Sequence, residues 1–264
     1  MTSRQIASAD YGLDAPGVVR NLVLGGIAGA VLWGSARLGL WSGQIAIPLS
    51  TDVLRIGVAD SGRFFALVLP LTALWMVWES KVGKLRNRDR MLDRLAWTGN
   101  EQVLDLGCGR GLLMIGAAKR LSTGTATGID IWQQEDLSGN RPEATLDNAR
   151  REGVAERVDV KTADMRALPF ADASFDVVVS RAAIHNLYDA ADRAQAIREV
   201  ARVLKPGGRA LIEDIRHGRE YEAVFRQSGC TGIQRVGSRG EALISTLITF
   251  GSLRPATLLV TKGS

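Results

Sequence analysis

The chain has 264 residues, of which 46% are hydrophobic and 23% charged, and its formal net charge is +5. This length suits one ordinary domain with an appended segment. The two cysteines, Cys108 and Cys230, exclude a disulfide framework, and no residue spacing indicates a metal site.

The N-terminal third contains two apolar runs. Residues 21–40 carry a single charge, Arg37, and a run of this length crosses a bilayer as a helix. Residues 64–78 include Pro70 and are short for a span, so they would need bilayer thinning or interfacial anchoring. We predict two transmembrane helices, with lipid contact through residues 21–78. Tryptophans within or beside the runs suit the membrane interface: Trp33, Trp41, Trp75 and Trp78.

Other interpretations of the first run remain open. A cleaved signal peptide fits poorly, because the run begins about 20 residues into the chain and exceeds a usual signal core. A buried soluble hairpin conflicts with the glycine content, whereas Gly25 and Gly29 would form a close-packing face in a membrane. One membrane helix followed by an interfacial segment is also compatible with the pattern.

A basic cluster follows the second run. Residues 81–94 combine two aspartates with six basic residues: Lys81, Lys84, Arg86, Arg88, Arg90 and Arg94. Residues 41–63 carry no comparable cluster. Positive charge marks the cytoplasmic side of a membrane and attracts anionic headgroups, although a solvated helix face has the same pattern.

This charge asymmetry predicts the topology and the domain boundary. Residues 1–94 are expected to form the membrane region, integral to the cytoplasmic membrane, and residues 95–264 a domain on its cytoplasmic side. We expect that domain to fold and to bind its ligand without the first 91 residues.

A glycine-rich turn opens this domain. Val103–Leu106 is typical of a buried parallel strand, and a helix is expected over residues 112–121. Between them, Gly107, Gly109 and Gly111 let the backbone turn and approach a ligand at the helix N-terminus. The spacing is G-x-G-x-G and not the G-x-G-x-x-G of nicotinamide-dependent dehydrogenases, which disfavours that alternative.

Further strands are predicted along the rest of the chain. One over residues 125–131 contains Asp130, and one over residues 158–164 ends at Asp164. Others are expected over residues 171–180, 209–215, 233–238 and 255–261. Alternating strands and helices predict an α/β fold with a doubly wound, mostly parallel, seven-stranded sheet. Ligands bind such sheets at the carboxyl ends of the strands.

Two more segments complete a recognisable pattern. Leu168–Asp176 has the sequence Leu-Pro-Phe-Ala-Asp-Ala-Ser-Phe-Asp, and Leu204–Gly208 reads Leu-Lys-Pro-Gly-Gly. With Asp105 and the glycine turn, this order and spacing resemble the class I S-adenosylmethionine-dependent methyltransferases. The similarity is to small-molecule enzymes of the ubiquinone and menaquinone type, over about residues 95–264. It implies a Rossmann-like fold and S-adenosyl-L-methionine as cofactor.

The resemblance also implies roles for the residues that follow each strand. Asp105 and the glycine turn would surround the methionine part of the cofactor, Asp130 would hold the ribose, and Asp164 would lie at the adenine edge. The implied cofactor residues are Asp105, Gly107, Cys108, Gly109, Gly111, Asp130, Ile131, Trp132, Asp164, Met165, Ser180 and Arg181.

Two residues are candidates for catalysis. His185 follows the fourth strand, where a neutral imidazole near the methyl group can accept a proton from the acceptor, or can simply order its loop. Asp214 ends the fifth strand and can orient a substrate, act as a base or have a structural role. The unusual segment 132–140 suits either a flap over the site or a tolerated insertion.

The sequence does not specify the methyl acceptor. The basic cluster adjoins the membrane run, so lipid headgroups explain it better than nucleic acid does, and no nucleic-acid partner is expected. Membrane attachment favours a small lipophilic acceptor, such as a quinone, a lipid headgroup, a phenol or a thiol. A methyltransferase for a soluble small molecule and a cofactor-binding protein without transfer activity remain alternatives. The oligomeric state is not indicated.

Overall fold

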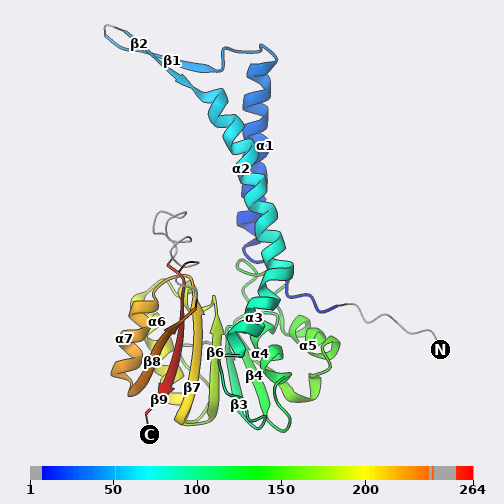
Figure 1. The fold of residues 1–264 in the computed structure, drawn as a ribbon, viewed down its shortest axis with the longest axis vertical. Helices are drawn as coiled ribbons and strands as arrows, with labels where there is room; N and C mark the ends of the chain where they lie inside the picture. The colour runs from blue at the N-terminus through cyan, green and yellow to red at the C-terminus, as the bar shows by residue number, and fades with distance from the viewer. Residues whose placement is uncertain (1–7, 51, 238–239, 241–253, 264) are drawn as a thin grey trace, which may run out of the picture. The chain divides into compact units, whose positions relative to one another are not determined.

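The computed structural model describes residues 8–50, 52–237, 240 and 254–263, and its chain divides into two compact units. The helical unit comprises Gly12–Lys84 and Gln134–Ser138. The sheet unit comprises Met1–Tyr11, Leu85–Gln133 and Gly139–Ser264. This grouping departs from a boundary at residue 94, because residues 85–94 and the N-terminal residues belong to the sheet unit. Figure 1 labels the elements of both units.

Two apolar helices form most of the helical unit. α1 spans Pro16–Arg37 and α2 spans Val58–Trp78, and each buries small residues against the other. A Cβ atom at Gly26 would lie 2.5 Å from Cγ of Pro70, and one at Gly29 would lie 2.7 Å from the carbonyl oxygen of Gly62. The helices therefore approach through glycine, as close-packed membrane helices do.

The observed helices differ in extent from the predicted runs. α1 begins at Pro16, whose fixed φ suits a first helical position, and Gly39 with its positive φ lies just beyond its end. α2 begins at Val58 and not at residue 64, because Asp60 and Arg63 interrupt the apolar run without interrupting the helix. At 21 residues α2 is no longer short for a span.

The second helix continues beyond the apolar run. A π-helical turn, η1, covers Glu79–Gly83, and α3 covers Lys84–Leu92. Within the described residues, Pro16–Arg37 and Val58–Leu92 are long and apolar enough to cross a membrane. A hairpin that the sequence analysis did not predict joins α1 to α2, with β1 at Gln44–Pro48 antiparallel to β2 at Val53–Gly57.

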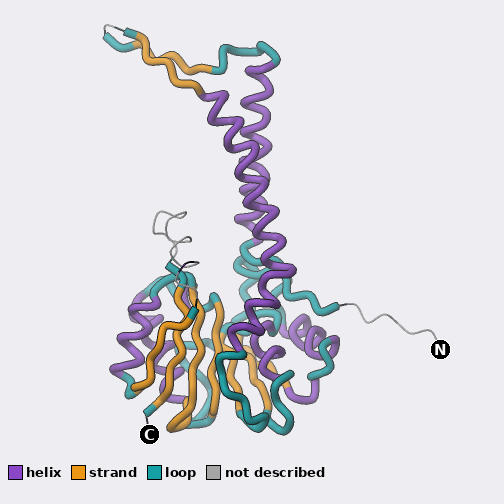
Figure 2. The backbone as a smooth tube through the Cα atoms, viewed as in Figure 1, coloured by secondary structure: helices purple, strands orange, loops and turns teal. Residues whose placement is uncertain are grey.

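The sheet unit contains the predicted seven-stranded sheet, which is confirmed (Figure 2). Its order is β5-β4-β3-β6-β7-β9-β8, and only β9 runs antiparallel to its neighbours among the described strands. The strands are β3 (Gln102–Leu106), β4 (Thr125–Asp130), β5 (Val158–Thr162), β6 (Phe175–Arg181), β7 (Leu204–Asp214), β8 (Cys230–Val236) and β9 (Ala256–Lys262). Ser238, at the end of one predicted strand, lies outside the described residues.

Helices cover both faces of the sheet. They are α4 (Leu112–Ala118), α5 (Pro142–Arg151), α6 (Ala190–Val203) and α7 (Gly218–Gln227), with short 3-10 turns η2 (Ala155–Arg157) and η3 (Ile184–Asn186). Val103 packs with α4 in one core cluster, and Leu104 packs with α6 and α7 in the other. Successive strand residues point to opposite faces, so both faces are buried, as a parallel sheet requires.

The N-terminal segment and α3 complete one of these cores. Tyr11, Met91 and Leu92 are at most 5% exposed and pack in the cluster that contains Val103. Removing the first 91 residues would therefore take Tyr11 and Met91 out of the core. The expectation that residues 95–264 fold without them is not supported by this packing.

Candidate functional site

The glycine turn and the end of β4 meet at the carboxyl edge of the sheet. β3 and β4 are parallel, with Leu106 opposite Ile129. The amide of Gly109 donates to Oδ2 of Asp130 at 2.8 Å, and the amide of Cys108 donates to the carbonyl of Ile129 at 3.0 Å. Two segments about 20 residues apart thus form one site.

The turn needs glycine at the predicted positions. Gly107, Gly109 and Gly111 all have positive φ angles, of 67°, 53° and 84°. A Cβ atom at Gly107 would lie 2.4 Å from Cβ of Ala183, which is a clash. Glycine at this position therefore lets the turn pack closely against Ala183, where any side chain would clash.

Asp105 lies beneath the turn as a buried carboxyl. It is 2% exposed and accepts a hydrogen bond from the amide of Met114 at 2.9 Å. Burial raises the pKa of Asp105 to about 8, the charge of Asp130 acts in the same direction, and the Met114 hydrogen bond opposes them. An incoming ammonium group would stabilise the ionised form, so this carboxyl fits the amino group of S-adenosylmethionine.

Asp130 occupies the position expected for a ribose ligand. Its Oδ1 accepts hydrogen bonds from the amide of Trp132 at 2.6 Å and from Nδ2 of Asn140 at 3.3 Å. Trp132 has a positive φ of 63°, and its indole N–H donates to Oγ1 of Thr162 at 2.7 Å. Ile131, between them, is 52% exposed and offers an apolar surface to a base.

Asp164 and Met165 follow β5. Nε and Nη2 of Arg166 donate to the carboxylate of Asp164 at 3.0–3.1 Å and 2.6 Å, and this pairing lowers the pKa of Asp164. Arg166 also pairs with Asp192 at the start of α6. Cε of Met165 is 3.6 Å from where a Cβ atom of Gly107 would lie, so Met165 borders the glycine turn.

Three other predicted residues have internal partners. Ser180 is buried and donates from Oγ to the carbonyl of Leu106 at 2.9 Å, and Arg181 donates from Nε to Glu213 at 2.8 Å. They join β6 to β3 and to β7. Cys108 is buried and its pKa is raised, chiefly by that burial, so it remains a thiol that packs beside Gly128.

The two catalytic candidates lie together. Nδ1 of His185 is 2.5 Å from Oδ1 of Asp214, although without the geometry of a hydrogen bond. Asp214 is 2% exposed, and its Oδ2 accepts the amide of His185 at 2.9 Å and the hydroxyl of Tyr221 at 3.1 Å. The sequence analysis did not predict this pairing, nor the part played by Tyr221.

Helix α5 supplies further residues that the sequence analysis missed. Oγ1 of Thr145 donates to the carbonyl of Gly109 at 2.7 Å, and Nδ2 of Asn148 donates to the carbonyl of Arg110 at 3.0 Å. Both side chains are at most 1% exposed. These two side chains bind carbonyl groups of the glycine turn. Polar residues on a short amphipathic helix are common, so the sequence does not indicate that these two support the turn.

The segment after β4 contacts the residues that precede α1. Within the helical unit, the amide of Ala15 donates to the carbonyl of Asp136 at 2.9 Å, and the amide of Ser138 donates to the carbonyl of Leu13 at 3.2 Å. An isolated antiparallel bridge joins Asp14 to Leu137. Part of the predicted insertion is therefore paired with the N-terminal chain.

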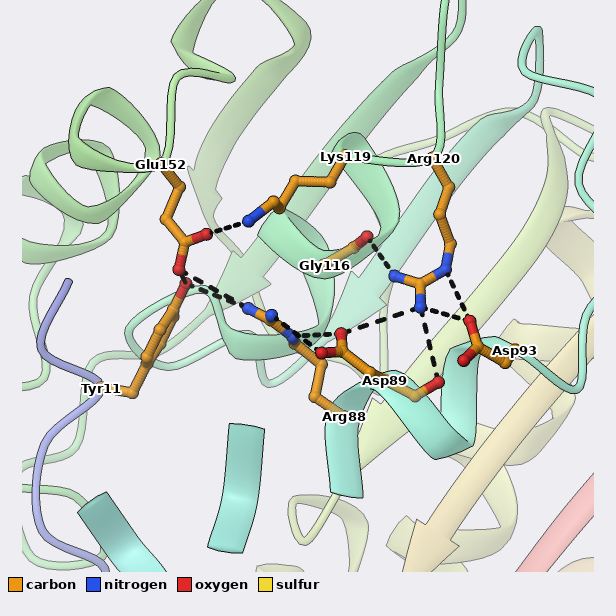
Figure 3. A network of polar contacts seen from close by, with 8 residues as sticks. All are labelled: Tyr11, Arg88, Asp89, Asp93, Gly116, Lys119, Arg120 and Glu152. Atoms are coloured by element: carbon orange, nitrogen blue, oxygen red, sulfur yellow. Dashed lines mark hydrogen bonds and ion pairs between the residues drawn. The ribbon is translucent and has the colours of Figure 1, made fainter. Parts of the chain in front are cut away.

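The basic cluster is only partly exposed. Lys84 is buried and pairs with Asp14 at 2.9 Å, and Arg88 is buried in the polar network that Figure 3 shows. In that network Arg88 contacts Asp89 and Glu152, at 2.9 Å and 3.7 Å. Two of the six basic residues predicted to bind headgroups are thus buried, whereas four are exposed: Lys81, Arg86, Arg90 and Arg94.

Comparisons with known proteins agree with this architecture. Residues 104–212 match the family described as "Methyltransferase domain". A methyltransferase of Streptomyces halstedii, GfsG, is 38% identical over 130 residues, which are 49% of this chain and 43% of that protein. The 27-O-demethylrifamycin SV methyltransferase of Amycolatopsis mediterranei is 37% identical over 49% of this chain and 44% of its own. The chain spans less than half the length of these relatives.

A third relative has a quinone-pathway name. The ubiquinone/menaquinone biosynthesis C-methyltransferase UbiE of Roseobacter denitrificans is 32% identical over 47% of this chain and 46% of that protein. Among solved structures, the cyclase SpnF has a TM-score of 0.54 and 22% identity, covering 68% of this chain and 81% of its own. A geranyl diphosphate methyltransferase in complex with S-adenosylmethionine has a TM-score of 0.54 and 17% identity, covering 74% and 90%.

These structural neighbours share the fold, while the family match covers the segment that holds the glycine turn, Asp130 and the end of β6. Residues 104–212 of this chain therefore match a methyltransferase domain, and the buried carboxyl and glycine turn of the sheet unit fit S-adenosylmethionine as its cofactor.

Proposed function

We propose that this protein transfers a methyl group from S-adenosylmethionine to a small lipophilic or membrane-associated acceptor, such as a quinone, a lipid headgroup, a phenol or a thiol. The observation that carries this proposal is the presence, in one chain, of a methyltransferase domain and two apolar helices of membrane-spanning length. An enzyme held at a bilayer meets acceptors that are concentrated in it.

The names of the relatives support this acceptor class. They describe enzymes for a rifamycin, a sterol and the ubiquinone or menaquinone precursors. The names specify an oxygen atom in the first case and carbon atoms in the other two, so the methylated atom differs among these relatives. Fold and family similarity do not select among them.

The cofactor residues have distinct tasks. The ionised Asp105 carboxylate binds the cofactor's ammonium group, and Asp130 accepts hydrogen bonds from the ribose hydroxyls. Ile131 packs on the adenine, and the bare backbone of the glycine turn admits the methionine part. When bound, S-adenosylmethionine supplies an electrophilic methyl group on a sulfonium, which is a good leaving group. The protein must then align the acceptor and exclude water.

His185 is the group we infer to take the acceptor's proton. The buried Asp214 carboxylate beside Nδ1 favours the tautomer that carries its proton there, which leaves the Nε2 lone pair available. A hydroxyl, amine or thiol acceptor can then lose its proton to Nε2 as its bond to the methyl group forms. Asp214 and Tyr221 orient the imidazole in this scheme.

We further propose that the protein is integral to the cytoplasmic membrane, with the sheet unit in the cytoplasm. The exposed Lys81, Arg86, Arg90 and Arg94 lie next to the second apolar helix, where the positive-inside rule predicts basic residues. Their attraction to anionic lipids contributes on the order of 1 kcal/mol each.

A turnover assay tests the proposal. The purified protein in nanodiscs is mixed with S-adenosylmethionine that carries a deuterated methyl group, first with a membrane lipid extract and then with the soluble extract. Release of S-adenosylhomocysteine, together with a labelled lipid-soluble product in the mass spectrum, is the expected result. A labelled product from the soluble extract alone would indicate a soluble acceptor. Cofactor binding without turnover on either extract would indicate a binding protein.

A further inference from the structure

Residues 8–11, which precede α1 in the chain, belong to the sheet unit and pack within it. We call residues 8–11 the N-terminal strap. The amide of Asp10 donates to Oδ1 of Asn148 at 2.9 Å, and Nδ2 of Asn148 donates back to the carbonyl of Asp10 at 2.9 Å. One buried side-chain amide on α5 therefore holds both backbone groups of a residue 138 positions away.

The same amide also holds the glycine turn. Nδ2 of Asn148 donates its second proton to the carbonyl of Arg110 at 3.0 Å, and Arg110 lies between Gly109 and Gly111. A second connection runs directly from the strap, because Nη2 of Arg110 is 3.3 Å from Oδ2 of Asp10. Backbone and side chain of the strap thus both reach the turn.

A separate contact fastens the strap to the domain. Tyr11 is 5% exposed, and its hydroxyl donates to Glu152 at 2.8 Å within the network of Figure 3. Glu152 in turn accepts a hydrogen bond from Lys119 at 2.6 Å. The Tyr11 hydroxyl contacts Glu152 and Arg88, which lie outside the glycine turn, so attachment and support of the turn can be separated by mutation.

We propose that the N-terminal strap positions the glycine turn for S-adenosylmethionine, with Asp10 and Asn148 as positioning residues that do not touch the cofactor. A turn with three glycines at positive φ has large conformational freedom to lose, so fixing it in advance strengthens binding. The inference rests on the proposed use of this turn for the cofactor. Cofactor affinity then depends on residues 8–11, which are distant in sequence from the glycine turn.

Coupling of this kind is reciprocal. If the docked strap strengthens cofactor binding, the bound cofactor must strengthen docking of the strap by the same factor. The amide of Asp10, which donates to Asn148, reports this docking through its hydrogen exchange. A strap with a merely structural role would gain no more protection than the rest of the sheet unit gains from ligand binding.

The test compares full-length variants in nanodiscs, using S-adenosylhomocysteine as the probe. Asn148→Asp keeps the side-chain shape but loses both donated hydrogen bonds, and we expect it to weaken binding by about tenfold or more. Asp10→Asn removes the negative charge that contacts Arg110. Because the Asp10 side chain is half-exposed, we expect this variant to weaken binding by about two- to fivefold. This second variant keeps the inference testable if Asn148→Asp does not fold.

Tyr11→Phe and Arg151→Ala are the matched controls. The first removes the hydroxyl from Glu152, and the second removes a hydrogen bond to the carbonyl of Ser8 at 3.1 Å. Each variant loses a hydrogen bond that attaches the strap to the domain and does not involve the glycine turn. Both variants should therefore lower Tm without changing affinity beyond about twofold. In the wild type, S-adenosylhomocysteine should slow hydrogen exchange in the peptide over residues 8–12.

Three results are decisive. If the loss of affinity were proportional to the loss of Tm in all four variants, the strap would be merely structural, and the inference would be overturned. Unchanged exchange at residues 8–12 on adding S-adenosylhomocysteine would do the same. A wild-type protein that binds no S-adenosylhomocysteine would instead refute the proposed function itself, and with it the role of the turn.

Discussion

The two units of this chain place their apolar side chains in opposite ways. In the sheet unit, the large apolar residues are buried on both faces of the sheet, and Leu104, Leu106 and Ile129 are 0% exposed. In the helical unit, residues of the same kind face outward, among them Leu24 at 56%, Val31 at 65% and Phe64 at 59%, while glycine and alanine are buried. Such exposure is unfavourable in water and expected in lipid, so this difference between the units supports the proposed membrane anchor.

The largest effect should come from removing a buried side chain of the sheet unit. Leu104 is 0% exposed in the core beneath α6 and α7. Leu104→Ala leaves a cavity and should lower the free energy of unfolding by about 2–5 kcal/mol. Leu24→Ala, on the exposed face of α1, should change it by less than about 1 kcal/mol, as urea titrations in nanodiscs can measure. Equal losses at the two positions would contradict the comparison.

The next largest effect concerns pH, because the sheet unit contains a buried carboxyl group. The folded pKa of Asp105 is about 8 and lies above its ordinary value of 3.8. Asp105 therefore contributes stability that is fully present below about pH 4 and is lost as the pH rises to about 8. In the proposed function the cofactor's ammonium group binds the ionised form, so affinity for S-adenosylhomocysteine should instead rise with pH, by at most about tenfold per unit.

Asp105→Asn separates these opposite trends. The variant should show a flatter dependence of Tm on pH between 4 and 8 in the cofactor-free protein, and a weaker, nearly pH-independent affinity. Calorimetry in buffers of different ionisation enthalpy should detect proton release on binding at pH 7 in the wild type. No proton release there would show that Asp105 does not meet the ammonium group.

The helical unit should be sensitive to the opposite kind of change. A Cβ atom at Gly29 would lie 2.7 Å from the backbone of α2, whereas one at Gly34 on the same helix meets nothing within 4 Å. Gly29→Val should therefore separate α1 from α2 and cost about 1–3 kcal/mol, while Gly34→Val should be tolerated. Crosslinking yields between cysteine pairs placed along the two helices would measure this. Equal yields for both variants would mean that the glycine contact is not what joins the helices.

The sequence predicts the sheet unit well where the signals are local. Val103–Leu106 and the glycines after it are read from neighbouring residues, and the structure has them as β3 and the turn before α4. The pairing of His185 with Asp214 and the contact of Asp10 with Asn148 join residues 29 and 138 positions apart. Periodic patterns in a sequence do not indicate which residues so far apart in the chain will meet. The fold and its motifs were therefore predictable, but the contacts that support the site were not.

The helical unit was harder to predict because hydropathy alone set its limits. Asp60 and Arg63 shortened the second apolar run, although both fit the first turns of a helix. The hairpin between the helices was missed for a related reason. No strand was predicted in Gln44–Pro48 or Val53–Gly57, because residues 41–63 were judged only by their lack of a basic cluster. The hairpin at the end of the two helices can be recognised only once the pairing of its two strands is known.

That hairpin gives the smallest and most local test of the comparison. Its register places Ile45 opposite Ile56 and Ile47 opposite Leu54, so these four side chains share one face, and each is 41–51% exposed. Ala46 and Arg55 share the other face. A lone two-stranded hairpin is marginally stable in water, but it directly joins two helices of spanning length, so its apolar face should lie on the outer bilayer interface.

Spin labels can decide this. Cys108 and Cys230 are buried, so a cysteine introduced at residue 46 or 47 can be labelled selectively. In nanodiscs, a label at residue 47 should be relaxed more by oxygen, which partitions into lipid, and one at residue 46 more by a water-soluble nickel complex. Equal access of nickel to both labels would place the hairpin in water, and dipolar broadening between labels at residue 47 would indicate pairing with a second copy. In either case the four aliphatic side chains of the hairpin would contact solvent or protein. The lipid-facing surface proposed for the helical unit would then include its helices but not its hairpin.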